Sequence, residues 1–118
     1  MKIVTFNVNG VRARMDTLIE WLDSTSPDVV ALQEIKIQDI DFPRSAFETL
    51  GYSCHLNGQK SFNGVAILTK GEAKLSSKLL PGNCDDRQAR FIEVYYRKKI
   101  YMYLFTKWKS KRYRKIFV

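Results

Sequence analysis

The chain has 118 residues, which allows one small domain, since single domains commonly run from about 100 to 200 residues. Hydrophobic residues make up 45% and charged residues 27%, a globular composition that excludes a largely disordered chain. The first residues form too short an apolar run for a signal peptide, and no segment reaches the roughly 20 apolar residues of a membrane span. We therefore expect a cytoplasmic protein without a membrane partner.

The formal net charge of +8 is distributed unevenly along the chain. Residues 1–96 hold 11 Lys and Arg against 12 Asp and Glu, whereas residues 97–118 hold 9 Lys and Arg and no acidic residue. A basic surface indicates nucleic-acid binding only where it belongs to the folded domain. The excess of positive charge therefore lies in the last 22 residues, and the preceding part of the chain is nearly neutral.

The two cysteines and the one histidine do not have the spacing of a metal or redox site. Cys54 and Cys84 lie far apart, so we interpret both as ordinary thiols. His55 lies beside Tyr52 and Leu56 in an apolar segment, which favours a strand residue without a role in chemistry.

The first third of the chain predicts a strand, a helix and a second strand. Residues 2–7 are rich in β-branched and aromatic side chains and end at the turn sequence Asn-Val-Asn-Gly. Apolar residues at helical spacing predict an amphipathic helix over 11–22, which Ser and Pro residues end. Residues 28–33 contain a continuous apolar run, typical of a strand buried on both faces. Together these segments predict a βαβ unit with parallel strands.

The following segments predict shorter elements. We expect a short helix over 43–50, a strand over 52–56, a loop over 57–64, a strand over 65–69 and another over 90–96. The strands on either side of the loop are expected to pair as an antiparallel hairpin. The sequence has no internal repeat.

Polar residues follow both strands of the predicted βαβ unit. Because parallel strands bring their carboxyl ends to one edge of a sheet, Asn7 and Glu34 should lie side by side. An amide and a carboxylate oxygen suit Mg²⁺, which a phosphodiesterase needs to neutralise phosphate and activate water. The residues alone also fit a plain alternative, in which Asn7 caps the helix or forms the turn and Glu34 is a solvated residue at a strand end.

Four linked motifs resemble the exonuclease III family of AP endonucleases. They are Phe-Asn-Val-Asn-Gly-Val-Arg-Ala at 6–13, Pro-Asp-Val-Val-Ala-Leu-Gln-Glu-Ile-Lys at 27–36, Leu-Gly-Tyr at 50–52, and Gly-Gln-Lys leading to Gly-Val-Ala-Ile-Leu-Thr-Lys over 58–70. The similarity extends over residues 1 to about 94. Ile35 and the segment 61–63 depart from the usual pattern, but neither change removes a ligand.

The resemblance implies a fold, a cofactor and a substrate. The fold is the α/β, four-layer sandwich of the endonuclease/exonuclease/phosphatase superfamily, of which this chain would form an incomplete N-terminal half. The cofactor is Mg²⁺, or Mn²⁺ in its place, with Glu34 as metal ligand and Asn7 beside the metal and phosphate. The substrate is duplex DNA with an abasic site or a 3′ end, bound by a monomer.

Residues that contact DNA are also implied by the resemblance. Asn9 belongs to the first motif, and Arg90 matches a position where the family keeps an arginine near the DNA. Lys36 and Lys60 could bind the phosphate backbone, where cations position a duplex without reading its sequence. For Arg90 the alternative is an exposed strand residue, and for the two lysines a solvated surface position.

The resemblance stops near residue 96, and the remaining family motifs are absent from the sequence. These are a Tyr-x-Pro-Asn-Gly motif, an Asp-x-Asn pair and a final Asp-His, so no complete catalytic set is present. Back-translation of residues 103–117, read one base later, permits Tyr-Leu-Pro-Asn-Gly, which predicts a frameshift near residues 96–102. The expected domain is therefore 1–96, followed by a basic tail over 97–118 that is read out of frame.

Other interpretations of the tail remain open. Lys and Arg alternate with Tyr103, Phe105, Trp108 and Tyr113, as in an arm that binds phosphates and stacks on bases. A basic amphipathic segment on a membrane surface is a third interpretation. Two functions therefore follow: a DNA-repair nuclease by family, and a non-catalytic remnant or nucleic-acid-binding fragment as the alternative.

Overall fold

The computed structural model describes residues 1–78, 88–105 and 113–117, which form two facing four-stranded sheets. The first sheet contains β1 (Ile3–Asn7), β2 (Val29–Gln33), β3 (Tyr52–Asn57) and β4 (Val65–Lys70) in the order β1-β2-β4-β3. The second contains β5 (Lys74–Ser77), β6 (Phe91–Tyr96), β7 (Lys98–Phe105) and β8 (Tyr113–Phe117) in chain order.

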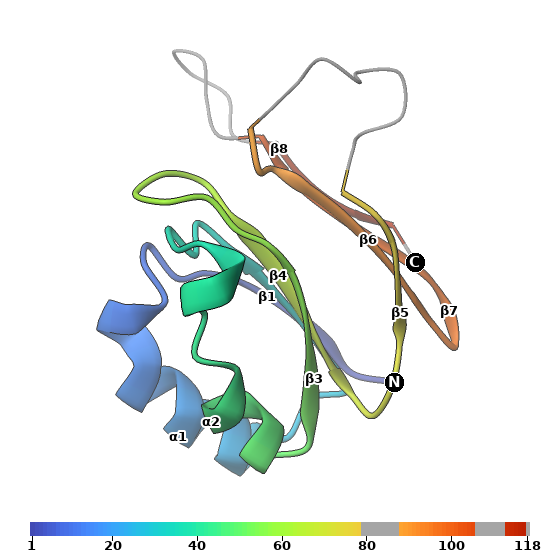
Figure 1. The fold of residues 1–118 in the computed structure, drawn as a ribbon. Coiled ribbons are helices and arrows are strands. Elements are labelled where there is room, and N and C mark those ends of the chain that lie inside the picture. Colours follow the sequence, from blue (N-terminus) through green and yellow to red (C-terminus); the bar gives the residue numbers. More distant parts are fainter. Residues whose placement is uncertain (79–87, 106–112, 118) are drawn as a thin grey trace.

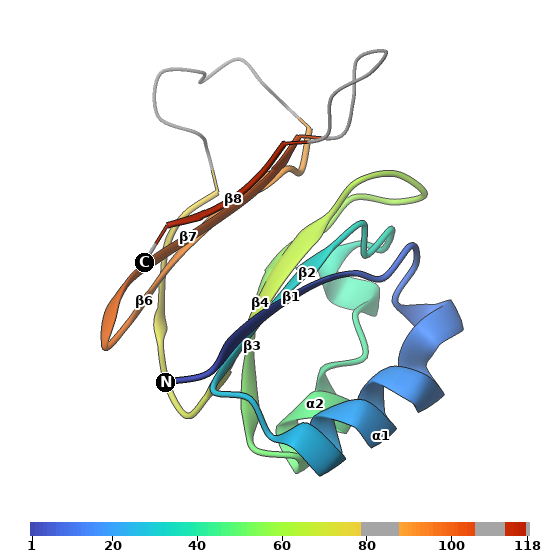
Figure 2. The same ribbon diagram turned by 180° about the vertical axis from the view of Figure 1, so that it is seen from behind.

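The helices cover only the outer face of the first sheet (Figure 1). These are α1 (Met15–Thr25) and α2 (Arg44–Thr49), with two 3₁₀ turns, η1 (Arg12–Arg14) and η2 (Asp39–Asp41). Seen from behind, the second sheet faces the opposite side of the first (Figure 2). The described residues thus form three layers of an α/β sandwich, helices, sheet and sheet, which confirms the predicted incomplete sandwich.

The predicted βαβ unit is confirmed. β1 pairs with β2 in parallel, and α1 connects them. The predicted helix begins at Met15 rather than Val11, because Arg12–Arg14 forms a 3₁₀ turn first. It ends where Ser26 takes a left-handed conformation, φ 46°, and donates its backbone N–H to the Leu22 carbonyl oxygen at 2.8 Å. The residue after this cap, Pro27, prevents the helix from continuing.

The hairpin of β3 and β4 is antiparallel, as predicted, and β4 also pairs with β2. Every residue of β2 is buried, which agrees with the apolar run that predicted a strand covered on both faces. His55 lies in β3 with Nε2 3.2 Å from Thr69 Oγ1, and Cys54 is a buried free thiol. Cys84 lies outside the described residues.

Two apolar clusters hold the layers together. One fills the space between the helices and the first sheet and includes Leu18, Leu22 and Phe47. The other lies between the two sheets and includes Ile67 and Ile92. None of the described helices is long and apolar enough to cross a membrane.

Candidate functional site

The candidate site lies at the edge of the first sheet where β1 and β2 end together. The register pairs Asn7 with Gln33, so Glu34 follows β2 beside the end of β1. Beyond the sheet the two chains continue in contact, since Gly10 N–H donates to the Glu34 carbonyl at 2.8 Å and Val11 N–H to the Ile35 carbonyl at 3.1 Å. The structure therefore brings the Asn7 and Glu34 segments together, as the sequence predicted.

A third segment, the loop before β4, joins this edge through its backbone. Ile35 N–H donates to the Gly64 carbonyl at 3.1 Å, and Lys36 N–H donates to the Asn63 carbonyl at 2.9 Å. Gly64 has no room for a side chain, because a Cβ there would lie 2.6 Å from Cγ1 of Ile35. The position of the Glu34–Lys36 segment thus depends on a close backbone approach at Gly64.

A fourth segment, the residues just before β6, reaches the same edge through the loop. Gly64 N–H donates to the Ala89 carbonyl at 2.9 Å, and Ala89 N–H donates to Gln59 Oε1 at 3.0 Å. Arg90 Nε donates to Asn63 Oδ1 at 3.4 Å, and Asn63 Nδ2 donates to Gln59 Oε1 at 3.2 Å. Gln59 and Asn63 therefore connect Arg90 to the Glu34 segment.

Neither of these two polar residues was predicted from the sequence to belong to the site. Gln59 belongs to the quoted Gly-Gln-Lys motif, which was the available signal, but its partner Ala89 is thirty residues away. Asn63 stands in a segment that departs from the family pattern, so no sequence signal assigned it a role.

Left-handed backbone conformations concentrate at this edge. Among the described residues other than glycine, positive φ angles occur at Asn9 (45°), Glu34 (54°), Lys36 (54°), Ser61 (66°) and Asn63 (50°), and otherwise only at Ser26 and Arg97. Such conformations cost about 1–3 kcal/mol each and cluster at functional sites. Backbone hydrogen bonds from Ile35 and Lys36 to the loop before β4 fix the segment that contains Glu34 and Lys36.

The side chains of the site are polar and reach solvent. Asn7 is half-buried, and its Oδ1 accepts the N–H of Asn9 at 3.1 Å. Lys36 is exposed and donates from Nζ to Asn9 Oδ1 at 2.5 Å. Glu34 is half-buried, and Lys60 is exposed in the loop before β4. The structure thus links Asn7, Asn9 and Lys36 directly, while Lys60 is placed only by its loop.

The donor set of this edge is small. Within the described ranges, no group of three or more His, Cys, Asp or Glu side chains comes together as a metal cluster. Glu34 offers one carboxylate and Asn7 one amide oxygen. Such a set can hold a hard cation that keeps most of its water ligands, and it is unsuited to a cation that needs a full protein shell.

A comparison with known protein families identifies the class of protein. The sequence pattern of the Endonuclease/Exonuclease/phosphatase family matches residues 4–106. The chain therefore belongs to this family.

Particular relatives are DNA-processing proteins. The chain is 45% identical over 92 residues to exodeoxyribonuclease III of Haemophilus influenzae, an alignment that covers 78% of this chain and 34% of that protein. It is 37% identical over 75 residues to DNA-(apurinic or apyrimidinic site) endonuclease 2 of Xenopus laevis, covering 59% of this chain and 14% of the relative. The chain thus spans about a third or less of these relatives.

The chain is also similar to part of solved structures of DNA-processing proteins. An AP endonuclease from Archaeoglobus fulgidus matches with a TM-score of 0.73 and 36% identity, over 80% of this chain and 36% of that chain. The 3′-5′ exonuclease NExo from Neisseria meningitidis matches with a TM-score of 0.70 and 36% identity, over 80% of this chain and 37% of that one. The described fold is therefore one part of the family sandwich.

Proposed function

We propose that this chain carries one part of the active site of an exonuclease III-type DNA-repair nuclease, a Mg²⁺-dependent phosphodiesterase acting at abasic sites and 3′ ends. The observation that carries the proposal is the junction of Asn7 and Glu34 at neighbouring strand ends, fixed by backbone hydrogen bonds. The similarity to exodeoxyribonuclease III supports it. We expect the chain in the cytoplasm and as a monomer.

Glu34 and Asn7 are the proposed ligands of the metal. Mg²⁺ accepts one or two protein oxygens and retains several waters, which fits one carboxylate beside one amide, and Mn²⁺ takes similar ligands. The Asn7 oxygen has two lone pairs and the Asn9 N–H uses one of them. When bound, the cation supplies charge neutralisation at the phosphate and a more acidic water.

Four further side chains are proposed to bind DNA. Arg90 is held by its Nε bond to Asn63, and a guanidinium suits a pair of phosphate oxygens. Lys36 and Lys60 are exposed cations on two neighbouring loops, suited to backbone phosphates that position a duplex. Asn9 would donate a hydrogen bond from its side-chain amide nitrogen, because its Oδ1 already accepts from Lys36.

The isolated chain is proposed to be inactive. Hydrolysis needs a base or water-positioning group within hydrogen-bond reach of the nucleophile. The sequence lacks the Asp-x-Asn pair and the final Asp-His that the family resemblance implies for that role. Magnesium-dependent nicking of an abasic-site duplex by the purified chain, abolished by Glu34→Ala, would contradict this statement.

The proposed function is tested by a chimera. Residues 1–94 of this chain replace the corresponding segment of Haemophilus influenzae exodeoxyribonuclease III, and Mg²⁺-dependent cleavage of an abasic-site duplex is measured. We expect an active chimera that Glu34→Gln slows by at least about 100-fold, because mutating even the partners of metal ligands costs about 10–100-fold. The control is Glu72→Gln, at an exposed carboxylate just after β4. A folded chimera that is inactive, or indifferent to Glu34→Gln, would refute the assignment.

A frameshift origin of residues from about 97 onward remains our proposal for the tail. Its support is the acid-free composition of residues 97–118 together with the shifted reading that restores Tyr-Leu-Pro-Asn-Gly. The nucleotide sequence decides between this origin and a nucleic-acid-binding arm. A shifted frame that lacks the motif and soon meets a stop codon would exclude the frameshift.

A further inference from the structure

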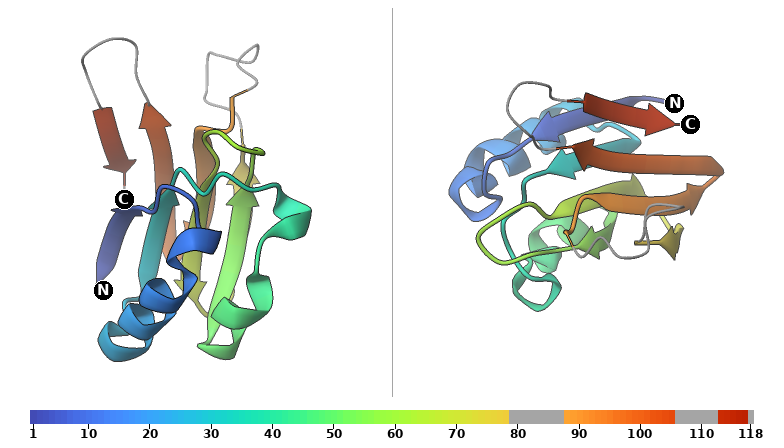
Figure 3. Two further views of the ribbon diagram at one scale, coloured as in Figure 1. Left: turned by 90° about the vertical axis from the view of Figure 1, so that its left-hand side faces the viewer. Right: turned by 90° about the horizontal axis from the view of Figure 1, so that it is seen from above.

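The loop between β3 and β4 is fixed at both ends against residues 35–39. At its start, Gly58 N–H donates to Asp39 Oδ1 at 2.5 Å, and a Cβ at Gly58 would lie only 2.9 Å from the Asp39 backbone nitrogen. At its end, the Gly64 carbonyl accepts the Ile35 N–H at 3.1 Å. Figure 3 shows this loop (yellow-green) at the same end of the two sheets as the chain that enters β6. The polar residues of the loop therefore start from a backbone with a fixed position.

Gln59, in this loop, holds the residue that precedes Arg90. Its Oε1 accepts the Ala89 N–H at 3.0 Å, and the Ala89 carbonyl accepts the Gly64 N–H at 2.9 Å. Ala89 is also only 6% exposed. The backbone directly before Arg90 is therefore bound on both sides by the loop.

The same Gln59 oxygen determines how the Asn63 side chain is turned. An amide side chain has an acceptor and a donor end, which a half-turn exchanges. Because the Ala89 N–H can only donate, Gln59 presents its oxygen here, and Asn63 Nδ2 donates to that oxygen at 3.2 Å. Asn63 Oδ1 then faces Arg90 and accepts from its Nε at 3.4 Å. We call this chain of bonds, from Ala89 N–H through Gln59 and Asn63 to Arg90, the amide relay.

The amide relay orients Arg90 with neutral groups. Among the described residues, the ion pair is that of Lys78 Nζ with Asp39 Oδ2 at 2.9 Å, which leaves the Arg90 guanidinium outside it. A carboxylate in place of Asn63 would hold Arg90 but would cancel much of its charge. Two amides therefore fix the guanidinium and keep its charge for an anion.

We propose that Gln59 is a positioning residue for Arg90, which it aims at a DNA phosphate through the amide relay. Asn63 engages Nε of Arg90, so the two Nη groups form the edge that can pair with two phosphate oxygens. Holding a long side chain in its bound orientation removes part of the entropy cost of binding. The inference rests on the proposed function, in which Arg90 binds DNA, and adds a residue that acts through Arg90.

The test uses the full ¹⁵N-labelled chain of 118 residues and a defined probe. The probe is a short duplex with one abasic site, added without divalent metal so that no cleavage occurs. Its dissociation constant is read from the amide signals of Asn9 and Lys36. We expect Arg90→Ala to weaken binding by at least about tenfold, because a charge-assisted hydrogen bond is lost. Gln59→Leu should weaken it by about three- to tenfold, because Arg90 is then no longer held.

The double variant decides whether Gln59 acts through Arg90. In an Arg90→Ala background, Gln59→Leu should change the dissociation constant by less than about twofold, because the two residues belong to one network and do not act independently. The full loss of about three- to tenfold in that background would mean that Gln59 supports the site in another way. That result would overturn the proposal.

Asn63→Gly breaks the amide relay at its next link. Asn63 has φ 50°, which glycine adopts freely, and its carbonyl can still accept the Lys36 N–H. We expect the same loss of affinity as for Gln59→Leu, and again no further loss in the Arg90→Ala background. The matched control is Ser61→Gly, an exposed position of the same loop with φ 66°, and Gln38→Leu is the control for the glutamine. No loss for Asn63→Gly, or an equal loss for Ser61→Gly, would contradict the relay.

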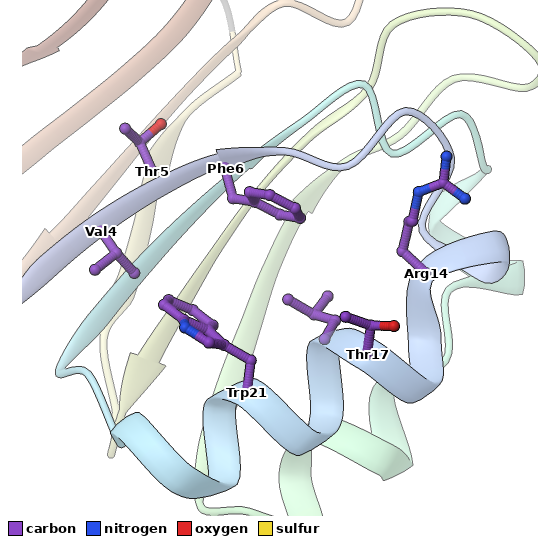
Figure 4. Close-up of a pocket in the computed structure, with 7 residues that line it drawn as sticks. Val4, Thr5, Phe6, Arg14, Thr17 and Trp21 are labelled. Atoms are coloured by element: carbon purple, nitrogen blue, oxygen red, sulfur yellow. The ribbon is translucent and has the colours of Figure 1, made fainter.

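A variant in another part of the chain separates loss of stability from loss of positioning. An apolar groove between β1 and α1 is lined by residues 4–6, 14, 17, 18 and 21, and Figure 4 shows Trp21 pointing from the helix toward β1. Trp21→Ala should lower the free energy of unfolding and leave the dissociation constant unchanged within about twofold. If Trp21→Ala weakens DNA binding as much as Gln59→Leu does, loss of stability explains both and the proposal fails.

The chimera with the Haemophilus domain distinguishes this proposal from the proposed function. If the chimera cleaves DNA in a Glu34-dependent manner but Gln59 and Arg90 act independently, the positioning role is refuted and the function stands. If Gln59 and Arg90 are coupled in DNA binding but the chimera does not cleave, the relay stands and the nuclease assignment fails. If the duplex shifts neither the Asn9 nor the Lys36 signal, the positioning role is refuted whatever the chimera does.

Discussion

Substitution of Gly64 tests whether a close backbone approach positions the candidate site. Gly64 has φ 85°, and a Cβ there would lie 2.6 Å from Cγ1 of Ile35. Ile35 cannot yield easily, because it is 1% exposed and its β-branched side chain is stiff. Overpacking of this kind costs about 1–3 kcal/mol, and the left-handed backbone adds about 1–2 kcal/mol for any residue with a Cβ. We expect Gly64→Ala to lower the free energy of unfolding by about 2–5 kcal/mol.

Gly71 offers a matched control for the backbone contribution. It also has φ 85°, but a Cβ there would meet no atom within 4 Å. Gly71→Ala should therefore cost only the conformational part, about 1–2 kcal/mol. In urea denaturation followed by circular dichroism, the two midpoints should differ by roughly 0.7–2 M at a slope of about 1.5 kcal/mol/M.

The site should respond to the same pair of substitutions. The Gly64 carbonyl accepts the Ile35 N–H, so displacement at Gly64 should shift the NMR amide signals of Glu34 and Lys36. Gly71→Ala should leave those signals in place. Equal midpoints for the two variants, or unchanged Glu34 and Lys36 signals in Gly64→Ala, would show that the close approach at Gly64 does not position this segment.

Three further predictions concern the core and the titrating groups. Phe47→Ala should lower the free energy of unfolding by about 3–5 kcal/mol, because this ring is fully buried and stacks on Phe42 with ring centroids 5.4 Å apart. Urea denaturation measures this loss. Burial raises the pKa of the Cys54 thiol to about 12, so peptide mass spectrometry should find it unmodified by iodoacetamide at pH 8 in the folded chain and alkylated in urea. Burial, and then the charge of Arg44, lower the pKa of His55 below its ordinary value of about 6.5. As the pH falls, the unfolded chain therefore binds a proton at His55 at a higher pH than the folded chain does. The contribution of neutral His55 to the free energy of unfolding is full above about pH 6.5 and is lost as the pH falls toward the folded pKa. His55→Gln should flatten that loss between pH 7.5 and 5.5, and an unchanged loss would contradict it.

The sequence was most informative where one pattern determined one element. The apolar run of β2 and the helical spacing of α1 predicted the βαβ unit, and parallel pairing then placed Asn7 beside Glu34. β5 was missed because Lys74–Ser77 is short and has almost no apolar side chains. Its place depends on pairing with β6, an interaction between distant segments that no local pattern reveals.

The connections within the site were not predictable from the sequence for a similar reason. Glu34 and Lys36 have left-handed backbone conformations although neither is a glycine, so the residue types gave no indication of these conformations. They are held by backbone bonds to the Gly64 and Asn63 carbonyls, which lie about thirty residues later in the chain. The role of Asn63 as a link to Arg90 depends on the same tertiary arrangement.

Metal binding by the chain tests whether Glu34 and Asn7 form a cation site. Mn²⁺ is added to the ¹⁵N-labelled chain, and the paramagnetic broadening of each amide signal is measured, which detects weak binding in the absence of catalysis. We expect broadening centred on Glu34 and the Asn7–Gly10 loop, abolished by Glu34→Gln and retained in Glu72→Gln. Broadening centred on another carboxylate, such as Asp39 or Asp41 in η2, or unchanged broadening in Glu34→Gln, would contradict it.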